Sequence, residues 1–469
     1  MPSILVPMIT GQYSGFKNEV VMTTDKHRVI YNGTLNSPGV VQTRPGSTLV
    51  SDFGTGNILG LHDASFQDGT HTQLATFGTK VYNAQTGTEF SSQAFTSGKN
   101  MEFVNFLNLV FGVNGQDAMF TLTSGGTYSA TTNVTNAPVA NYIARYGSRI
   151  WANDTTNKRR VHRSLAVSAG AITWDTTTEF FDATCAGDLI TGIHVARNTL
   201  MAFTNEDIEI RYFTRALLGT LRDVGTLSPR SVVTARGTTF WFHHDEVDGF
   251  RGIYGYDGAG ADTAQQVSSP VQDVFDAMPE SYIDNVVGWK EGSSIVWYLG
   301  GDITTLDYGT VNCVCLNIKT KGWSTWYLPY TILAAHVFLN NSTGVRTSYF
   351  GVSDGGVYSR LGRKDGSADI EAFLMPFPLS GPDTFAYYQF QDLNVKGSQF
   401  GSTRVIFRTD TEDKWNEEGL RESFKSKSIY EGKLGGSGSA IEMKLGLNDQ
   451  VGQLIKSYKV GYQTSSTKQ

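Results

Sequence analysis

The sequence predicts an all-β protein, a β-propeller of six or seven blades followed by a C-terminal β-sandwich-like domain. Apolar residues alternate with a period of two almost throughout, and strand–turn–strand units recur every ~35–55 residues. The 51 glycines against 12 prolines indicate many tight turns and few helices. Stacking small sheets around an axis buries faces that one sheet would leave open. We expect an N-terminal arm and entry strand at 1–50, the propeller at 51–369 and the C-terminal domain at 370–469.

Individual strands are predicted where aromatic and β-branched residues cluster. Such segments include Thr238–His243, Ser294–Leu299 and Arg404–Arg408. The repeating units end in similar short sequence motifs, for example Gly78–Tyr82 and Asp354–Arg360. Strands bounded by turns, without crossover helices, are typical of propellers, although a string of β-sandwiches would also give such motifs.

Helical periodicity is scarce. A short helix is predicted at Val271–Ala277, because Pro270 precedes apolar residues at helical spacing. A second short helical piece is predicted at Thr214–Thr220. The C-terminal domain is expected to have longer strands around a charged, Gly/Ser-rich loop at 409–439.

Composition excludes several classes of protein. Apolar residues make up 40% of the chain and charged residues 17%, which excludes a disordered protein. The low charge indicates surface buried against partners. No apolar run reaches the roughly 18 residues of a membrane span, and the first residues, MPSI, do not open a secretory signal. The net charge of −6 gives no overall basic field for nucleic acid.

Two clusters have the residue types of a metal site. His243 and His244 lead into Asp245 and Glu246, but neighbouring residues of a strand point to opposite faces, so a hairpin tip is the favoured interpretation.

Cys313 and Cys315 share one face of a strand, and Cys185 is far away in sequence. Buried, apolar cysteines in a reducing compartment are expected, because three cysteines form no disulfide framework.

The densest basic run contains Lys158, Arg159, Arg160 and Arg163. Such a run can bind phosphate or nucleic acid. No aromatic side chains are interleaved with these charges, so we favour an exposed hairpin at a blade edge that meets a carboxylate of a neighbouring chain. The run is therefore the candidate interface patch.

No catalytic motif is found. The segment Ser168–Trp174 is similar to the Asp-box hairpin of sialidase-like propellers, but Ala169 and Gly170 stand where the acidic residue belongs. Glycosidases need two carboxylates at a fixed separation, and no pair is indicated. We expect no enzymatic activity, no cofactor and no metal.

Three stretches resemble the packaged-DNA stabilisation proteins of short-tailed bacteriophages, also called tail hub or nozzle proteins, which are related to tail tubular protein B. The first stretch is Asn36–Gly46. The second combines Ser148–Asn153 with Arg160–Ser164 and Ile172–Asp175. The third and closest is Asp188–Phe213. The resemblance covers residues 30–215 well and the rest loosely.

The resemblance implies a structural protein of the virion tail, made in the bacterial host cytoplasm. Members of the family form a homohexameric ring below the portal and its adaptor, extend the DNA channel, help to retain the packaged genome and open on ejection. The implied partners are other copies of the chain, the adaptor, fibre, spike or needle proteins, and double-stranded DNA that passes without sequence-specific binding. The alternatives are a glycan-binding or depolymerising tail protein and a propeller that binds peptides at its central face.

Overall fold

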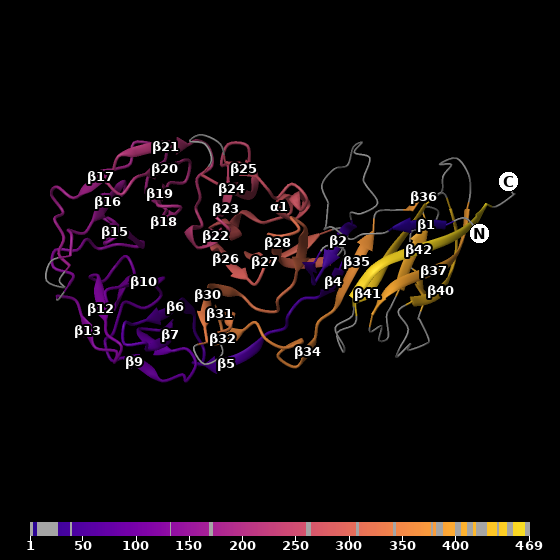
Figure 1. The fold of residues 1–469 in the computed structure, drawn as a ribbon, viewed down its shortest axis with the longest axis horizontal. Helices are drawn as coiled ribbons and strands as arrows, with labels where there is room; N and C mark the ends of the chain where they lie inside the picture. Colours follow the sequence, from indigo (N-terminus) through magenta and orange to yellow (C-terminus); the bar gives the residue numbers. More distant parts are fainter. Residues whose placement is uncertain are drawn as a thin grey trace.

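The computed structural model describes most of residues 27–376 and the strands on either side of them. The described ranges are 3–6, 27–37, 40–131, 133–167, 172–258, 264–305, 309–340, 344–376, 379–380, 388–398, 405–409, 416–418, 429–438, 440–447 and 454–464. They contain mainly β-strands, and Figure 1 shows a ring of blades on one side with the C-terminal strands beside it.

The propeller has seven blades, each built on four antiparallel strands, which confirms the predicted fold class. The first blade contains β6 (Ile58–Ser65), β7 (His71–Phe77), β8 (Lys80–Asn83) and β9 (Glu89–Ser91). The second contains β10 (Glu102–Phe106), β11 (Leu109–Val113), β12 (Phe120–Leu122) and β13 (Tyr128–Ser129). The third contains β14 (Ile143–Tyr146), β15 (Arg149–Asn153), β16 (Arg160–Arg163) and β17 (Phe180–Asp182). The fourth contains β18 (Gly192–Ala196), β19 (Thr199–Phe203), β20 (Ile208–Arg211) and β21 (Leu217–Leu221).

The remaining blades follow the same order. The fifth contains β22 (Val233–Ala235), β23 (Thr238–His244), β24 (Arg251–Tyr256) and β25 (Gln265–Gln266). The sixth contains β26 (Val286–Glu291), β27 (Ser294–Thr305), β28 (Gly309–Asn317) and β29 (Trp323–Trp326). The seventh contains β30 (Ile332–Leu339), β31 (Arg346–Val352) and β32 (Gly356–Ser359), and its outermost strand is β5 (Thr48–Asp52).

Strand β5 closes the ring. It pairs antiparallel with β32, so that Thr48 lies opposite Ser359 and Asp52 opposite Gly356. Residues 1–50 were expected to lead into the first blade, and this is wrong for β5. A strand from the start of the chain instead completes the last blade, because a closed propeller needs one sheet that joins distant parts of the chain.

A separate apolar cluster fills each of the seven spaces between neighbouring blades. Strand β15 contributes side chains to two clusters. Trp151 packs toward the fourth blade, whereas Ile150 and Ala152 pack toward the second. The period-two alternation of the sequence therefore buries both faces of the blade.

Two-residue turns connect the first and second strands of several blades. The pairs Leu107–Asn108, Arg197–Asn198 and Arg236–Gly237 all have positive φ, between 45° and 82°. Two consecutive residues with positive φ are typical of the tight turn whose twist matches that of an antiparallel hairpin. The first hairpins are thus short, and residues beside them are held close to the propeller axis.

Helices are minor elements. Helix α1 (Gln272–Asp276) lies within the predicted Val271–Ala277, and the 3₁₀ helices are η1 (Pro229–Ser231) and η2 (Glu280–Asn285). The helix predicted at Thr214–Thr220 is wrong, because Arg215 has φ of 76° and residues 217–221 form β21. None of the helices in the described ranges is long and apolar enough to cross a membrane.

The C-terminal strands form two sheets together with strands from the start of the chain. One sheet has the order β3 (Gly33–Ser37), β4 (Val40–Thr43), β42 (Leu454–Thr464), β37 (Tyr388–Ser398) and β40 (Ile429–Gly438), with β1 (Ser3–Val6) on β42. The other continues the sixth blade from β29 through β2 (His27–Tyr31), β35 (Ala372–Pro376), β41 (Ala440–Leu447), β38 (Val405–Thr409) and β39 (Asn416–Glu418), with β36 (Leu379–Ser380) on β41. A two-stranded hairpin, β33 (Lys364–Asp365) and β34 (Ala368–Asp369), links the propeller to these strands.

The loop predicted at 409–439 is wrong for residues 416–418 and 429–438, which form strands, and residues 410–415, 419–428 and 439 lie outside the described residues. Residues 429–438 form β40, which pairs with β37 from Lys396↔Ile429 to Tyr388↔Gly438. Three further residues form β39. The Gly/Ser-rich composition indicated a loop, but the long partner strand β37 supplies the hydrogen bonds that hold this segment extended.

Candidate functional site: the central funnel

A large cavity lies on the propeller axis. It measures about 710 Å³, and its walls include residues of the innermost strands of all seven blades: β6, β10, β14, β18, β22, β26 and β30. A site on this axis draws one to four residues from the first strand of each blade, so its residues are far apart in the sequence.

Arg230 closes one end of this cavity. It lies in η1, just before the fifth blade, and its guanidinium reaches across the axis. Nη1 donates to the carbonyl of Leu333 (2.7 Å) and Nη2 to that of Leu59 (2.5 Å). Nε donates to Oε1 of Glu102 at 3.0 Å. One side chain therefore links the beginnings of the first, second and seventh blades.

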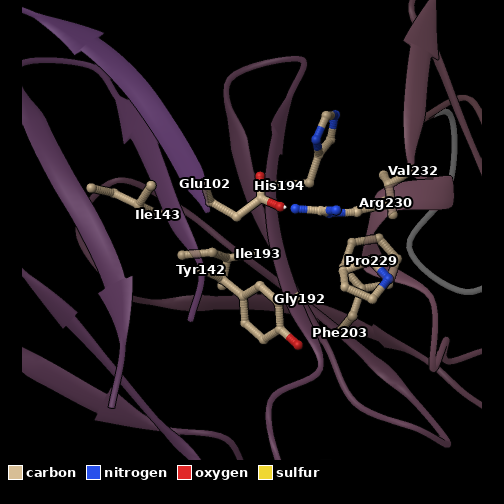
Figure 2. A pocket seen from close by; sticks show the side chains of 10 residues that line it. All are labelled: Glu102, Tyr142, Ile143, Gly192, Ile193, His194, Phe203, Pro229, Arg230 and Val232. Carbon is tan, nitrogen blue, oxygen red and sulfur yellow. Dashed lines mark hydrogen bonds and ion pairs between the residues drawn. The ribbon is translucent and has the colours of Figure 1, made fainter. Parts of the chain in front are cut away.

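The Glu102–Arg230 pair forms the floor of what we call the central funnel. Figure 2 shows the carboxylate and the guanidinium pointing toward each other, with His194 beside them. A smaller cavity of about 70 Å³, lined in part by Tyr142 and Phe203, lies next to the pair. Arg230 crosses the funnel at this end, and the opposite end is lined by the exposed Lys290 and Arg346.

Three histidines line the wall of the funnel. Nε2 of His62 lies 2.9 Å from Oδ1 of Asn105, and Nε2 of His194 lies 2.8 Å from the hydroxyl of Thr234. The ring centroids of His336 and His62 are 5.4 Å apart. Burial lowers the pKa of His62, lowers that of His194 to about 4, and, with the nearby His62, lowers that of His336 to about 3. All three are neutral near pH 7, and His62 and His194 act as hydrogen-bonding groups.

The funnel has the chemistry of a binding site. Its single carboxylate, Glu102, is engaged by Arg230, so no second carboxylate stands opposite it as a general acid–base pair would require. Within the described residues no three His, Cys, Asp or Glu side chains gather as metal ligands. Polar groups on a partly apolar, concave wall suit the recognition of a polar ligand.

The structure places the predicted patch, Lys158, Arg159, Arg160 and Arg163, on the hairpin β15–β16 and along β16. Arg160 forms a two-point ion pair with Asp182 (2.7 and 2.9 Å) and lies 3.6 Å from the ring centroid of Phe180. Both residues belong to this chain, so the carboxylate expected from a neighbouring chain is supplied internally. The side chain of Lys158 is exposed.

The other two members of the run are bound inside the third blade. Arg163 is 7% exposed, and its Nη2 lies 2.5 Å from Oε2 of Glu179, so it is not part of an exposed patch. Arg159 donates to the backbone carbonyls of Ala183, Cys185 and Gly187. Arg159 thus holds the loop after β17, whereas Arg160 and Arg163 bind carboxylates in β17 and just before it.

The two metal-like clusters are also dispersed by the fold. His243 is buried, and its Nδ1 lies 2.8 Å from the carbonyl oxygen of Gly225. His244 is its neighbour on β23, so the two rings project to opposite faces.

Cys185, Cys313 and Cys315 are all buried and free. Burial raises the pKa of Cys185 to about 11 and that of Cys315 to about 12, and also raises that of Cys313. Of the Asp-box-like segment, Ser168, Ala169, Gly170 and Ala171 lie outside the described residues.

Sequence reasoning missed Arg230, Glu102 and the wall histidines. Each stands alone in the sequence, and the three histidines are separated by more than 100 residues, at positions 62, 194 and 336. Glu102 and the three histidines share a position on the first strand of a blade, and Arg230 lies just before one, which can be recognised only after the blades have been assigned.

Comparisons with known proteins give no family for this chain. No family model matches it, and no curated protein matches it. Among solved structures, the computationally designed Ika8 protein is similar at 12% identity and a TM-score of 0.41, covering 67% of this chain and 99% of that one. The WD40 domain of Neurospora crassa Pan2 is similar at 10% identity and a TM-score of 0.42, covering 68% of this chain and 94% of that one.

Proposed function

We propose that this chain is a structural subunit of a short-tailed bacteriophage tail, a hub or nozzle protein located in the virion. In this proposal copies assemble head to tail into a ring, six in number, below the portal and its adaptor. The ring extends the DNA channel, helps to retain the genome and takes part in its ejection. Two lines support it: the sequence resemblance, and the apolar side chains exposed at two edges of the disc.

The apolar edges carry the proposal. Strand β21 is the outer strand of the fourth blade, with a partner strand on one side only, and its Leu217 and Leu218 are 48% and 37% exposed. Strand β5 is the outer strand of the seventh blade, and its Leu49 is 47% exposed, near Leu361 at 52%. Exposed edge strands with large apolar side chains are favourable sites for association.

The two edges lie on nearly opposite sides of the propeller. Figure 1 shows β21 at the top of the ring of blades and β5 at the bottom. Two different surfaces on opposite sides make a head-to-tail contact, and such contacts close into a ring when the rotation between copies permits. Arg230 spans the axis of the single propeller, so in this proposal the DNA passes through the centre of the ring of subunits.

Replacing Leu217 and Leu218 by Glu tests the proposal. We expect the purified wild-type protein to form a closed hexamer, alone or on the adaptor ring, in size-exclusion chromatography with light scattering. Charges on an apolar contact should reduce the double variant to a monomer. The matched control is Val247→Glu, because Val247 is apolar and 92% exposed but lies in a turn of the fifth blade away from both edges.

A wild-type protein that stays monomeric at high concentration and with the adaptor would contradict the proposal. So would a double variant that assembles as well as the Val247→Glu control. Binding or hydrolysis of bacterial surface polysaccharide by a stable monomer would favour the alternative of a glycan-binding or depolymerising tail protein.

A further inference from the structure

Basic residues follow one another on the face of the propeller at which the central funnel opens, and two of them, Lys290 and Arg346, line the funnel itself. The turns that join first and second strands lie at this end, because Arg230 ties the beginnings of the first strands together at the other end. Five successive blades, the third to the seventh, carry a cation in or next to this turn. These five residues, here called the basic arc, are Arg145, Arg197, Arg236, Lys290 and Arg346.

Contacts between blades place Arg197 beside the turn that contains Arg236, and Lys290 beside the strand that contains Arg346. The guanidinium of Arg145 lies 5.2 Å from the ring centroid of Phe106, at the end of the neighbouring first strand β10. The side chain of Arg197 lies against Gly237, in the turn of the next blade. The carbonyl of Lys290 accepts a hydrogen bond from Ser348, two residues beyond Arg346, at 3.0 Å.

The charges of the basic arc are uncompensated. All five side chains are exposed, and within the described residues none has a carboxylate within ion-pair distance. Nearby acidic groups are otherwise occupied: Glu291 is paired with Arg360 at 3.2 Å, and Asp63 accepts from the backbone of Leu339 at 3.2 Å. The arc therefore forms a local positive region on a chain of net charge −6.

The shape and flanks of the arc favour a polypeptide over a nucleic acid. A duplex carries one charge per roughly 1.7 Å and would be repelled by the acidic remainder of the chain. The exposed apolar groups flanking the arc are aliphatic, Leu107 at 37% and Val345 at 54%, and suit side-chain contacts rather than base stacking. The concave funnel inside the arc, with its neutral histidines, can take a single polar side chain.

We propose that the basic arc and the funnel mouth bind an acidic segment of a partner protein, with its carboxylates on the arc and one side chain in the funnel. This inference concerns the face of the propeller that carries the first hairpins, whereas ring assembly concerns the outer strands. The two surfaces meet at Arg197, which lines one small cavity together with Leu218. The inference assigns a docking role to the face that carries the first hairpins. The net negative charge of the chain gives no indication of this role.

A labelled peptide with the sequence of residues 410–418 tests the inference, because five of its nine residues are Asp or Glu. Fluorescence anisotropy should give micromolar binding to the wild-type protein that weakens as NaCl rises from about 50 to 300 mM. The variant Arg197→Asn/Arg236→Asn/Arg346→Gln should bind about tenfold or more weakly. Asn is chosen at positions 197 and 236 because it tolerates positive φ.

Three controls make the result decisive. A peptide with Asn and Gln in place of Asp and Glu should not bind. The variant Lys99→Gln/Lys158→Gln removes two exposed cations away from the arc and should bind the acidic peptide as the wild type does. Circular dichroism should show that both variants are folded.

Equal peptide binding by the arc variant and the wild type would overturn the inference. So would tighter binding of a duplex of about 20 base pairs that is lost in the arc variant, since the arc would then be a nucleic-acid surface.

Discussion

Arg230 shows how much depends on the geometry of one side chain. Its planar guanidinium donates in three directions at once, to two backbone carbonyls and to Glu102. A lysine ammonium at the same position carries the same charge but lacks the rigid fork that spans these acceptors. Arg230 therefore links blades that are distant in the sequence through hydrogen bonds.

Replacing Arg230 by Met should lower the free energy of unfolding by about 2 kcal/mol, because two carbonyls and a carboxylate lose a charged donor. Arg230→Lys should recover only part of this loss. Glu102→Gln should cost less than about 1 kcal/mol, since the Glu102 side chain is 37% exposed and its ion pair is screened. Urea denaturation followed by tryptophan fluorescence would measure all three. An Arg230→Lys variant as stable as the wild type would show that charge alone matters here.

The wall histidines should make the propeller sensitive to acid. Their pKa values are about 4 for His194 and about 3 for His336 in the folded chain, against 6.5 for an ordinary histidine. As the pH falls below 6.5, the unfolded chain takes up these protons first, so stability is lost between pH 6.5 and pH 4 and is fully present above pH 6.5. Each histidine contributes at most about 1.4 kcal/mol per pH unit.

Replacing His336 by Leu should flatten this decline without changing its direction. The measurement is the urea midpoint from pH 8 to pH 4, for the wild type and the variant in parallel. An unchanged slope would show that His336 is protonated in the folded protein above pH 4.

At this scale the sequence predicts residue types better than residue partners. The basic run was recognised because its charges are adjacent, yet the carboxylates that bind Arg160 and Arg163 lie about 20 residues further along the chain. The basic arc was missed for the converse reason, because its members are isolated in the sequence and gathered only by the ring. Pairing in space is set by strand register, which local composition does not encode.

Among the elements, the segment before β5 is held by a buried ion pair. Nη2 of Arg44 lies 2.5 Å from Oδ2 of Asp365, and the two side chains are 1% and 6% exposed. Ser47 donates to the same carboxylate at 2.6 Å, and Nε of Arg44 donates to Asn32 at 2.9 Å. This clasp joins the chain just before β5 to the hairpin β33–β34.

Breaking the clasp from one side should be costly. Arg44→Met leaves the Asp365 carboxylate buried without its cation, and we expect a loss of about 3–5 kcal/mol. The double variant Arg44→Met/Asp365→Leu removes both charges and should be closer to the wild type than either single variant. A double variant with the summed cost of the single ones would show that the two residues act independently. Chemical denaturation of the wild type, the two single variants and the double variant measures the four free energies of unfolding that this double-mutant cycle needs.

Strands were predictable from sequence where both faces are buried, and less so at the edges. Thr238–His243 and Ser294–Leu299 lie in β23 and β27, at the centre of their blades. The composition of residues 217–221 suits a helix or a strand, and these residues form a strand because they pair with β20. Edge strands have one partner and one exposed side, so their patterns are weak.

At the scale of the molecule, the sequence indicated a propeller but left its blade number between six and seven. The seventh blade was hard to recognise because its four strands are not contiguous: three come from residues 332–359 and the fourth from residues 48–52. Repeats read along the chain show only three strands at residues 332–359 and leave residues 48–52 without a blade. This distance in sequence between β5 and β32 also explains why the sequence of residues 1–50 indicates an arm.

The pairing of β5 with β32 also sets an order of events during synthesis. About 300 residues separate the two strands, so at roughly 5–20 residues per second β5 leaves the ribosome about 15–60 seconds before its partner exists. Through that interval the apolar Leu49 and the unpaired backbone beside it stand open to other nascent chains. We expect a demand for chaperones that ends only when the last blade is translated, and a chain truncated before residue 356 should aggregate although six of its blades are complete.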